Sequence, residues 1–102
     1  MRRAARRDAN HVEVGDFLRA LGWSVLDLAS AGNGTPDYVV GKTGYACLVE
    51  VKDGNKVPSK RKLTEKEQKV RDRWDGPYIV ALSGEDAAAQ LALLMFHPKS
   101  GG

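Results

Sequence analysis

The chain has 102 residues, a length that supports one hydrophobic core rather than two. Hydrophobic residues at 42% and charged residues at 28% lie in the globular range, which excludes wholesale disorder. The net charge of +3 hides an asymmetry: residues 1–8 carry four arginines and one aspartate, residues 56–73 carry eight basic and three acidic groups, and the remainder holds four basic and nine acidic groups. Two basic segments around an acidic centre indicate a protein that handles a polyanion with a cation at its middle.

The first predicted element is a helix over residues 8–21 that Gly22 ends, because apolar residues recur there at the spacing i, i+3, i+4, i+7. Its predicted buried face consists of Val14, Phe17, Leu18 and Leu21. A strand over residues 23–28 follows. Pro36 then closes a loop and places Asp37 at the beginning of the next strand.

Two apolar runs, 38–40 and 45–51, flank the segment Gly-Lys-Thr-Gly, which predicts a β-hairpin. A basic loop separates this hairpin from a second predicted helix. That helix begins at Thr64, since Glu67 three residues later has the capping-box spacing, and it extends to about Trp74.

A strand over residues 78–82 and a helix over residues 87–96 complete the chain. Ser83 with Asp86 repeats the capping pattern ahead of that last helix. The predicted order is α-β-β-β-α-β-α, which indicates an α/β fold.

The cysteine content and the hydropathy pattern restrict where the protein works. Its single cysteine, Cys47, excludes an internal disulfide framework and a cysteine-based zinc cluster. We interpret Cys47 as a small buried hydrophobic residue. No segment approaches the ~18 apolar residues of a membrane span, and the arginine-rich start lacks the apolar core of a signal peptide. We therefore expect no membrane partner and a reducing cytoplasm.

Three charged residues, Asp37, Glu50 and Lys52, stand in or beside otherwise apolar strands. Glu50 and Lys52 lie two positions apart, so both side chains project from one face of the strand, while Val51 points to the core. Burying such a pair lowers the stability of the fold, so a buried pair at this position indicates a function. The hairpin is expected to bring Asp37 within one or two pairing positions of Glu50, and two carboxylates that close repel each other unless one is protonated or a cation lies between them.

A divalent metal ion would relieve this repulsion. Mg²⁺ prefers carboxylate oxygens and retains water and substrate phosphate in its shell, where it polarises the phosphate and lowers the pKa of a bound water. Lys52 beside it would stabilise negative charge on the phosphate or orient the attacking water. From the residues alone an alternative stays open, in which Asp37 caps a turn and Glu50 with Lys52 forms a solvated cross-strand pair.

A longer pattern surrounds these residues. Pro36-Asp37 is followed by twelve residues and then by Glu50-Val51-Lys52. The accompanying segments are Asp8-Ala9-Asn10 with Glu13, residues 34–41, residues 50–54, and Lys62-Leu63-Thr64 with Gln68. Together these motifs, over about residues 7–82, resemble the PD-(D/E)XK nuclease superfamily, in particular its small phage and bacterial VRR-NUC and Holliday-junction-resolvase-like members.

The resemblance implies a restriction-endonuclease-like core, with a central mixed sheet flanked by helices, in one domain over residues 1–102. We expect a flexible basic N-terminus over about residues 1–7 and a short tail over about residues 98–102. The cytoplasm would be that of a bacterium or of a phage-infected host.

The resemblance also implies site residues. Asp37 and Glu50 would be metal ligands, helped by the Val51 carbonyl, and Lys52 would be the catalytic lysine. Glu13 matches the acid of the first helix that joins the site through metal or water, and Gln68 matches a polar residue of the following helix near the active centre. An ordinary exposed position remains the alternative for both Glu13 and Gln68.

Two departures from the family pattern matter. Many relatives carry an acid directly after Asp-Ala-Asn, whereas this chain has His11, which leaves Glu13 as the acid in position. We interpret His11 as a helix-start residue or a phosphate contact. We also expect no extra domain for target recognition, which argues against sequence-specific restriction.

We therefore expect an endonuclease that hydrolyses DNA with Mg²⁺, or with Mn²⁺ in its place, and that selects a junction, a flap or a nick. Basic side chains would offset the acidic centre and make binding sensitive to salt. The candidates are Arg2, Arg3, Arg6, Arg7, Lys56, Lys60, Arg61 and Lys62. For the first of these arginines, a solubility tail is the alternative.

Cutting both strands together requires two active centres, and the resembling resolvases are dimers, so we expect a homodimer. The residues proposed for its contact are Leu91, Leu94, Met95 and Phe96 on the last helix. Two other functions stay open: a nuclease-fold protein that binds or assembles on DNA without catalysis, and a small RNA-binding module.

Overall fold

Within residues 10–96, which the structure describes, the computed structural model contains three α-helices and a four-stranded mixed sheet. The α/β class and the mixed sheet expected from the sequence are confirmed. The elements in chain order are α1 (His11–Ala20), β1 (Ser24–Asp27), the 3₁₀ turn η1 (Ala29–Ala31), β2 (Tyr38–Lys42), β3 (Tyr45–Val51), the 3₁₀ turn η2 (Pro58–Arg61), α2 (Glu65–Arg73), β4 (Tyr78–Ala81) and α3 (Gly84–Phe96).

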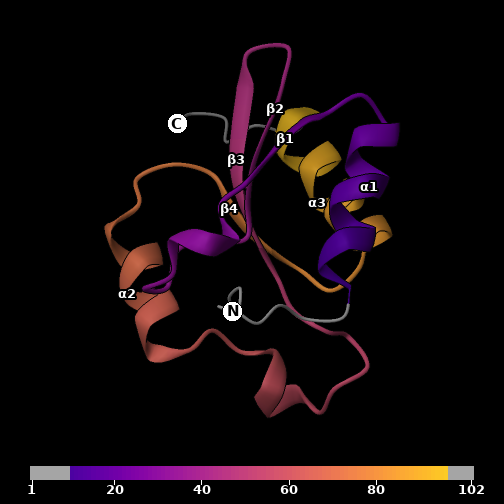
Figure 1. Ribbon diagram of the computed structural model, residues 1–102. Helices are drawn as coiled ribbons and strands as arrows, with labels where there is room; N and C mark the ends of the chain where they lie inside the picture. Colours follow the sequence, from indigo (N-terminus) through magenta and orange to yellow (C-terminus); the bar gives the residue numbers. More distant parts are fainter. Residues whose placement is uncertain (1–9, 97–102) are drawn as a thin grey trace.

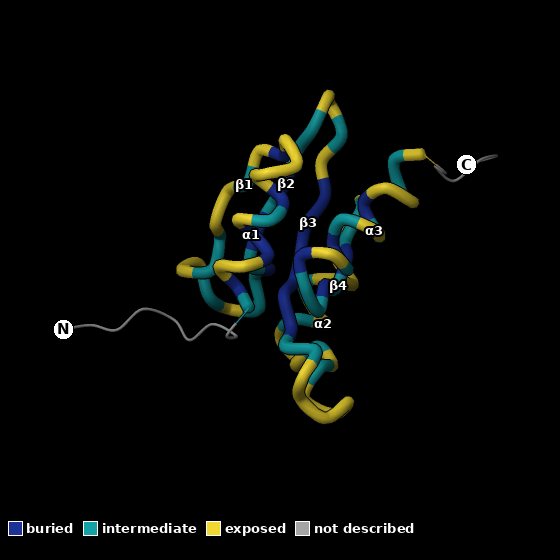
Figure 2. The backbone as a smooth tube through the Cα atoms, turned by 90° about the vertical axis from the view of Figure 1, so that its right-hand side faces the viewer, coloured by how far each residue is buried: buried dark blue, intermediate teal, exposed yellow. Residues whose placement is uncertain are grey.

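The sheet has the strand order β1-β2-β3-β4, antiparallel across the first two pairs and parallel between β3 and β4. Helices α1 and α3 lie side by side against one face, and α2 lies on the opposite side (Figure 1). Strand β3 is buried along most of its length (Figure 2). The core between the sheet and the helix pair is formed by Val14, Leu18, Trp23, Tyr38, Val40, Cys47, Val49, Val51, Ile79, Ala81, Ala87 and Leu91.

Helix α1 buries a narrower face than its spacing predicts. Val14 and Leu18 are fully buried, but Leu21 is 47% exposed. The expectation that Leu21 belongs to the core is wrong. The helix ends at Ala20, so Leu21 is not part of it and does not continue its buried face. Gly22 follows in the left-handed region with φ at 96°, as expected of a residue that ends a helix. The predicted first residues, 8 and 9, lie outside the described part.

The hairpin between β2 and β3 has a tighter turn than the sequence suggests. Lys42 pairs with Tyr45, so only Thr43 and Gly44 form the loop, and both have positive φ, at 48° and 84°. This is the pattern of a type I′ turn, whose twist matches that of the strands. Gly41 belongs to β2 rather than to the loop.

Thr43→Asn is expected to raise the free energy of unfolding by about 0.5–1 kcal/mol, because asparagine tolerates the left-handed region better than a β-branched residue. Urea unfolding of the two proteins measures this difference. As a control, Gly44→Ala places a methyl group at φ 84° and should shift the midpoint in the opposite direction. A lower midpoint for Thr43→Asn would contradict the turn assignment.

The two later helices begin at caps that the sequence indicates. Thr64 and Glu67 form the complete capping box of α2, which confirms that prediction. Ser83 Oγ accepts a hydrogen bond from Asp86 N, as expected. Helix α3 nevertheless begins at Gly84, three residues earlier than predicted, because it starts directly after Ser83.

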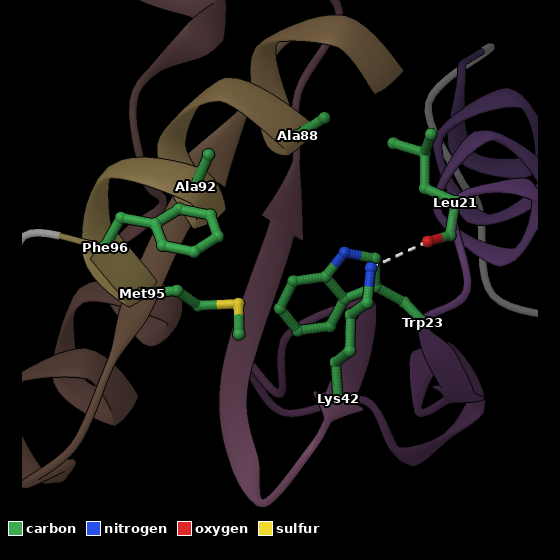
Figure 3. A pocket seen from close by; sticks show the side chains of 7 residues that line it. All are labelled: Leu21, Trp23, Lys42, Ala88, Ala92, Met95 and Phe96. Atoms are coloured by element: carbon green, nitrogen blue, oxygen red, sulfur yellow. Dashed lines mark hydrogen bonds between the residues drawn. The ribbon is translucent and has the colours of Figure 1, made fainter.

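Among the described helices, none combines the length and the apolar character that crossing a membrane requires. An apolar groove of about 230 Å³ lies between the end of α1, the sheet and the last turns of α3 (Figure 3). Lys42 crosses it, with Nζ donating to Leu21 O at 2.8 Å and lying 5.7 Å from the centre of the Trp23 ring. The other residues that line the groove are Ala88, Ala92, Met95 and Phe96.

The residues proposed for a dimer contact do not form one exposed face. Leu91 is fully buried in the core, and Leu94 and Met95 pack against it. Including Leu91 in a surface is wrong because it lies on the α3 face that contacts the sheet. Phe96 is 74% exposed, and Leu93, which the sequence analysis does not select, is 61% exposed.

Candidate active site

Glu50 lies near the end of β3 and Lys52 directly follows that strand; both are buried, with 5% and 8% of their surface exposed. Lys52 Nζ lies 3.7 Å from Glu50 Oε2, so the two side chains project from the same face of the strand as predicted. Val51 between them belongs to the core. Because both charged groups are withdrawn from water, the interpretation as a solvated pair is wrong.

Asp37 lies directly before β2, opposite the end of β3. Tyr38 pairs with Val49, and continuing this antiparallel register by one residue places Asp37 opposite Glu50. Asp37 Oδ2 accepts a hydrogen bond from Val51 N at 2.8 Å. The backbone of the second strand therefore fixes the carboxylate of the first, and the predicted proximity of Asp37 to Glu50 follows from the hairpin register.

A third carboxylate, that of Glu67 in α2, joins this group. Lys52 Nζ donates to Glu67 Oε1 at 2.8 Å. The resemblance points to Gln68, one position along the helix, but that side chain is exposed and donates to Asp72 Oδ1 at 2.8 Å. The role of Gln68 stays a prediction. The capping-box spacing points to Glu67, but only as a residue that caps a helix.

The surroundings of Glu50 disfavour its ionised form. Burial, then the negative charges of Asp37 and Glu67, raises the pKa of Glu50 to about 9, although the Lys52 ammonium acts in the opposite direction. Burial also raises the pKa of Glu67, but hydrogen bonds from Lys52 and from Thr64 N outweigh it and hold that pKa below its ordinary value. In the absence of a metal ion, neutral Glu50 therefore stands beside ionised Glu67 at neutral pH.

Tyr78 in β4 borders the same group of charges. Burial, followed by the charges of Glu50 and Glu67, raises its pKa. Its hydroxyl is buried without a hydrogen-bond partner, and the Arg71 guanidinium lies 5.2 Å from the centre of its ring.

His11, at the start of α1, lies between Asp37 and Asp27 and contacts both carboxylates. Its ring is 1% exposed, with Nδ1 2.7 Å from Asp37 Oδ1 and Nε2 3.2 Å from Asp27 Oδ2. The ring stacks on Tyr38, whose hydroxyl donates to the His11 carbonyl. His11 therefore orients Asp37 from inside the protein, and its interpretation as a phosphate contact is wrong because both of its ring nitrogens face carboxylates. In the sequence, the only signal for this role is that position 11 holds a histidine where many relatives of the resembling family carry an acid.

Asn10 and Glu13 hold the start of α1 against the strand ends. Asn10 Nδ2 donates to Lys52 O at 3.0 Å and to Leu82 O at 2.7 Å, which ties α1 to the residues that directly follow β3 and β4. Glu13 is exposed, and its Oε1 accepts from Gly84 N at 3.2 Å, at the positive end of α3. Its role at a metal ion stays a prediction. Both residues line a cavity of about 430 Å³ together with Asp53, Gly54, Asn55, Leu82 and Ser83.

The basic candidates differ in exposure. Lys56, Lys60 and Lys62 are exposed around η2. Arg61 is half-buried, and its Nε lacks a hydrogen-bond partner. Four further candidates lie outside the described residues: Arg2, Arg3, Arg6 and Arg7.

One direct observation indicates that the carboxylates of Asp37 and Glu50 fit a divalent cation. Glu50 Oε1 is buried and has no hydrogen-bond partner. A cation there would satisfy this oxygen and favour the ionised form of Glu50 beside Asp37. Among residues 10–96 no group of three or more His, Cys, Asp or Glu side chains is arranged to hold a metal ion. A metal at this site would therefore have two carboxylates as its protein side-chain ligands and take the rest of its shell from backbone, water or substrate, as Mg²⁺ does.

Comparison with known proteins adds nothing to this geometry: no family model, curated protein or solved structure matches the chain.

Proposed function

We propose that this protein is a Mg²⁺-dependent endonuclease that hydrolyses phosphodiester bonds in DNA, and that it selects DNA by structure rather than by sequence. The observation that carries the proposal is the burial of Glu50 and Lys52 beside Asp37. Ionisable groups held together away from water are unfavourable for stability, and such sites are typical of catalytic centres.

The arrangement of elements supports the same proposal. The chain runs α1-β1-β2-β3-α2-β4-α3 when the 3₁₀ turns are left aside, and Asp37 and Glu50 come from the two strands of one hairpin. This arrangement is the one implied by the resemblance to PD-(D/E)XK nucleases. That this fold is a nuclease core is itself part of what we propose.

Asp37 and Glu50 would hold the divalent ion, with the Val51 carbonyl as the backbone ligand that the resemblance implies. When bound, the ion would polarise the phosphodiester and supply a water molecule of lowered pKa. The Lys52 ammonium would stabilise negative charge that develops on the phosphate oxygens. His11 would keep Asp37 in a fixed orientation, as hydrogen-bond partners of metal ligands do.

Exposed lysines beside the site would bind the DNA backbone. Lys56, Lys60 and Lys62 directly follow the catalytic strand, and α2 adds Lys66 and Lys69. These groups would make binding weaken steeply with salt.

The proposal is tested by incubating the protein with four-way junctions, flaps, nicked and linear duplexes and single strands in Mg²⁺. The wild type should cleave at least one of these DNAs, whereas Asp37→Ala, Glu50→Ala and Lys52→Ala should not. Asp16→Ala is a matched control, since Asp16 lies on the exposed side of α1. If the wild type and all three site variants cut equally well, the activity comes from elsewhere and the proposal is wrong. Matched RNA substrates test the RNA-binding alternative.

One observation favours the non-catalytic alternative, in which the protein binds DNA without cutting it. Both Asp37 oxygens already have protein partners, His11 and Val51 N. Titration calorimetry with Mg²⁺ and Mn²⁺ separates the two functions, because salt-sensitive DNA binding without any metal binding supports the alternative.

A homodimer is part of the proposal because a single centre cuts one strand. Phe96 lines the groove of Figure 3 and is exposed, and Leu93 on the same helix is also exposed; these two replace buried Leu91 as the proposed contact. Sedimentation analysis of the wild type and Phe96→Ser measures this association.

A further inference from the structure

We propose that Glu67 positions the Lys52 ammonium group and, through the same contact, fastens helix α2 to the catalytic strand. The role assigned to Lys52 rests on the proposed function, whereas the contact itself does not. The two side chains meet at 2.8 Å from Nζ to Oε1, and both are largely withdrawn from water, with 10% and 16% of their side-chain surface exposed. An ion pair this close and this buried holds its geometry far better than a surface pair does.

Helix α2 fixes the Glu67 carboxylate independently of Lys52. Glu67 Oε1 accepts a hydrogen bond from Thr64 N at 2.8 Å, and Thr64 Oγ1 accepts one from Glu67 N at 3.2 Å. The capping box therefore restrains both the backbone N–H group and the side-chain carboxylate of Glu67. One oxygen atom therefore receives a donor from the helix start and a donor from β3, so the position of the ammonium follows from that of the helix.

Helix α2 has few other means of attachment. It contains no buried residue, and it lies across the sheet from α1 and α3 (Figure 1). Its remaining contacts include Arg71 over the ring of Tyr78 and a close approach of its first turn to Gly34, where a Cβ atom would fall 2.5 Å from Lys66 O. Because little apolar surface holds α2, a polar contact carries an unusually large share of its docking.

The position of Lys52 matters because its ammonium has a second carboxylate nearby. Nζ lies 3.7 Å from Glu50 Oε2, compared with 2.8 Å from Glu67 Oε1. Without Glu67, the ammonium is expected to move toward Glu50, which is a ligand in the proposed metal site. Because a misplacement of about 1 Å can lower a rate by about 10²-fold, Glu67 is a positioning residue with a measurable effect on turnover.

Three variants separate positioning from helix stability. Glu67→Ala removes the carboxylate from Lys52 and from the cap. Glu67→Gln keeps an oxygen for Thr64 N but removes the charge. Thr64→Ala weakens the capping box and leaves Glu67 to pair with Lys52, so it is the matched control for lost helix stability, at about 1 kcal/mol.

The first readout uses the metal-free protein, by NMR of lysine ammonium groups, with Lys52 assigned through Lys52→Arg. A buried and hydrogen-bonded ammonium exchanges slowly and gives its own signal. We expect the same signal in the wild type and in Thr64→Ala, and its shift or loss in Glu67→Ala. An unchanged Lys52 signal in Glu67→Ala would overturn the proposal.

The second readout is cleavage, well below the melting temperature of each variant. We expect kcat to fall about 10²-fold in Glu67→Ala and less in Glu67→Gln, with KM little changed, and Thr64→Ala to stay close to the wild type. Equal losses in Thr64→Ala and Glu67→Ala, with Glu67→Gln unaffected, would assign Glu67 a purely structural role and overturn the positioning role. If the wild type cuts no DNA, the proposed function fails, while the NMR comparison still decides the contact.

Discussion

Glu50→Gln is expected to make the metal-free protein more stable at pH 8 while lowering DNA cleavage by about 10³-fold. The stability effect follows from the raised pKa of Glu50, about 9 in the folded protein against an ordinary 4.5. Between these values the folded protein keeps a proton that the unfolded chain releases. The free energy of unfolding therefore falls as pH rises, by about 1.4 kcal/mol per pH unit from this one group.

Glutamine has nearly the same shape and cannot ionise, so the variant should lack this slope. The two proteins should have similar stability near pH 4.5 and diverge up to about pH 9, as measured by urea unfolding across pH without metal. The lowered pKa of Glu67 has the opposite sign, since its contribution is lost as pH falls below its ordinary range, and it is common to both proteins. Parallel curves for the two proteins would contradict the raised pKa of Glu50.

Mg²⁺ gives the matching experiment for the same pair of proteins. A ligand that binds only the folded state stabilises it, so Mg²⁺ should raise the unfolding midpoint of the wild type at pH 8. Glu50→Gln, which has lost a ligand oxygen charge, should respond much less. If the protein is more stable without the Glu50 carboxylate, that would support the proposal that this site serves activity rather than folding.

His11→Ala is expected to lower the free energy of unfolding by about 3–5 kcal/mol. The ring is among the largest fully buried side chains, and its removal leaves a cavity against Tyr38. It also leaves Asp37, with only 12% of its side chain exposed, without its short contact to Nδ1. The loss of packing and the loss of a partner for a buried carboxylate add together.

Val12→Ala is the control for this prediction, because Val12 is the next residue of α1 and is 58% exposed. Its midpoint in urea should change by about 0.5 kcal/mol or less. His11→Ala should also reduce cleavage, since Asp37 would no longer be held in one orientation. A His11→Ala protein as stable as Val12→Ala would contradict this prediction, because neither the packing of the ring nor its contact with Asp37 would then contribute to stability.

Local features of this protein follow from short stretches of its sequence. The Thr64–Glu67 spacing predicts the start of α2 because a capping box depends on atoms within one helical turn. The alternation of Glu50, Val51 and Lys52 predicts which side chains share a face, because a strand has a period of two. The apolar runs around Gly-Lys-Thr-Gly predict the hairpin, and its register then brings Asp37 opposite Glu50.

Only the tertiary structure decides which distant residues complete the site. Glu67 and Gln68 are neighbours in sequence, but successive helical positions point about 100° apart, so the docked orientation of α2 determines which one reaches Lys52. In the same way, the packing of α1 over the end of the sheet determines that His11 lies between Asp27 and Asp37 and that Glu13 reaches Gly84. The sequence by itself therefore determined the α/β elements and the Asp37, Glu50 and Lys52 group, since their arrangement depends on local periodicity and on one hairpin. The partners that hold this group in place depend on the rotation of whole helices, which the buried face of α1 sets for that helix and which polar contacts largely set for α2.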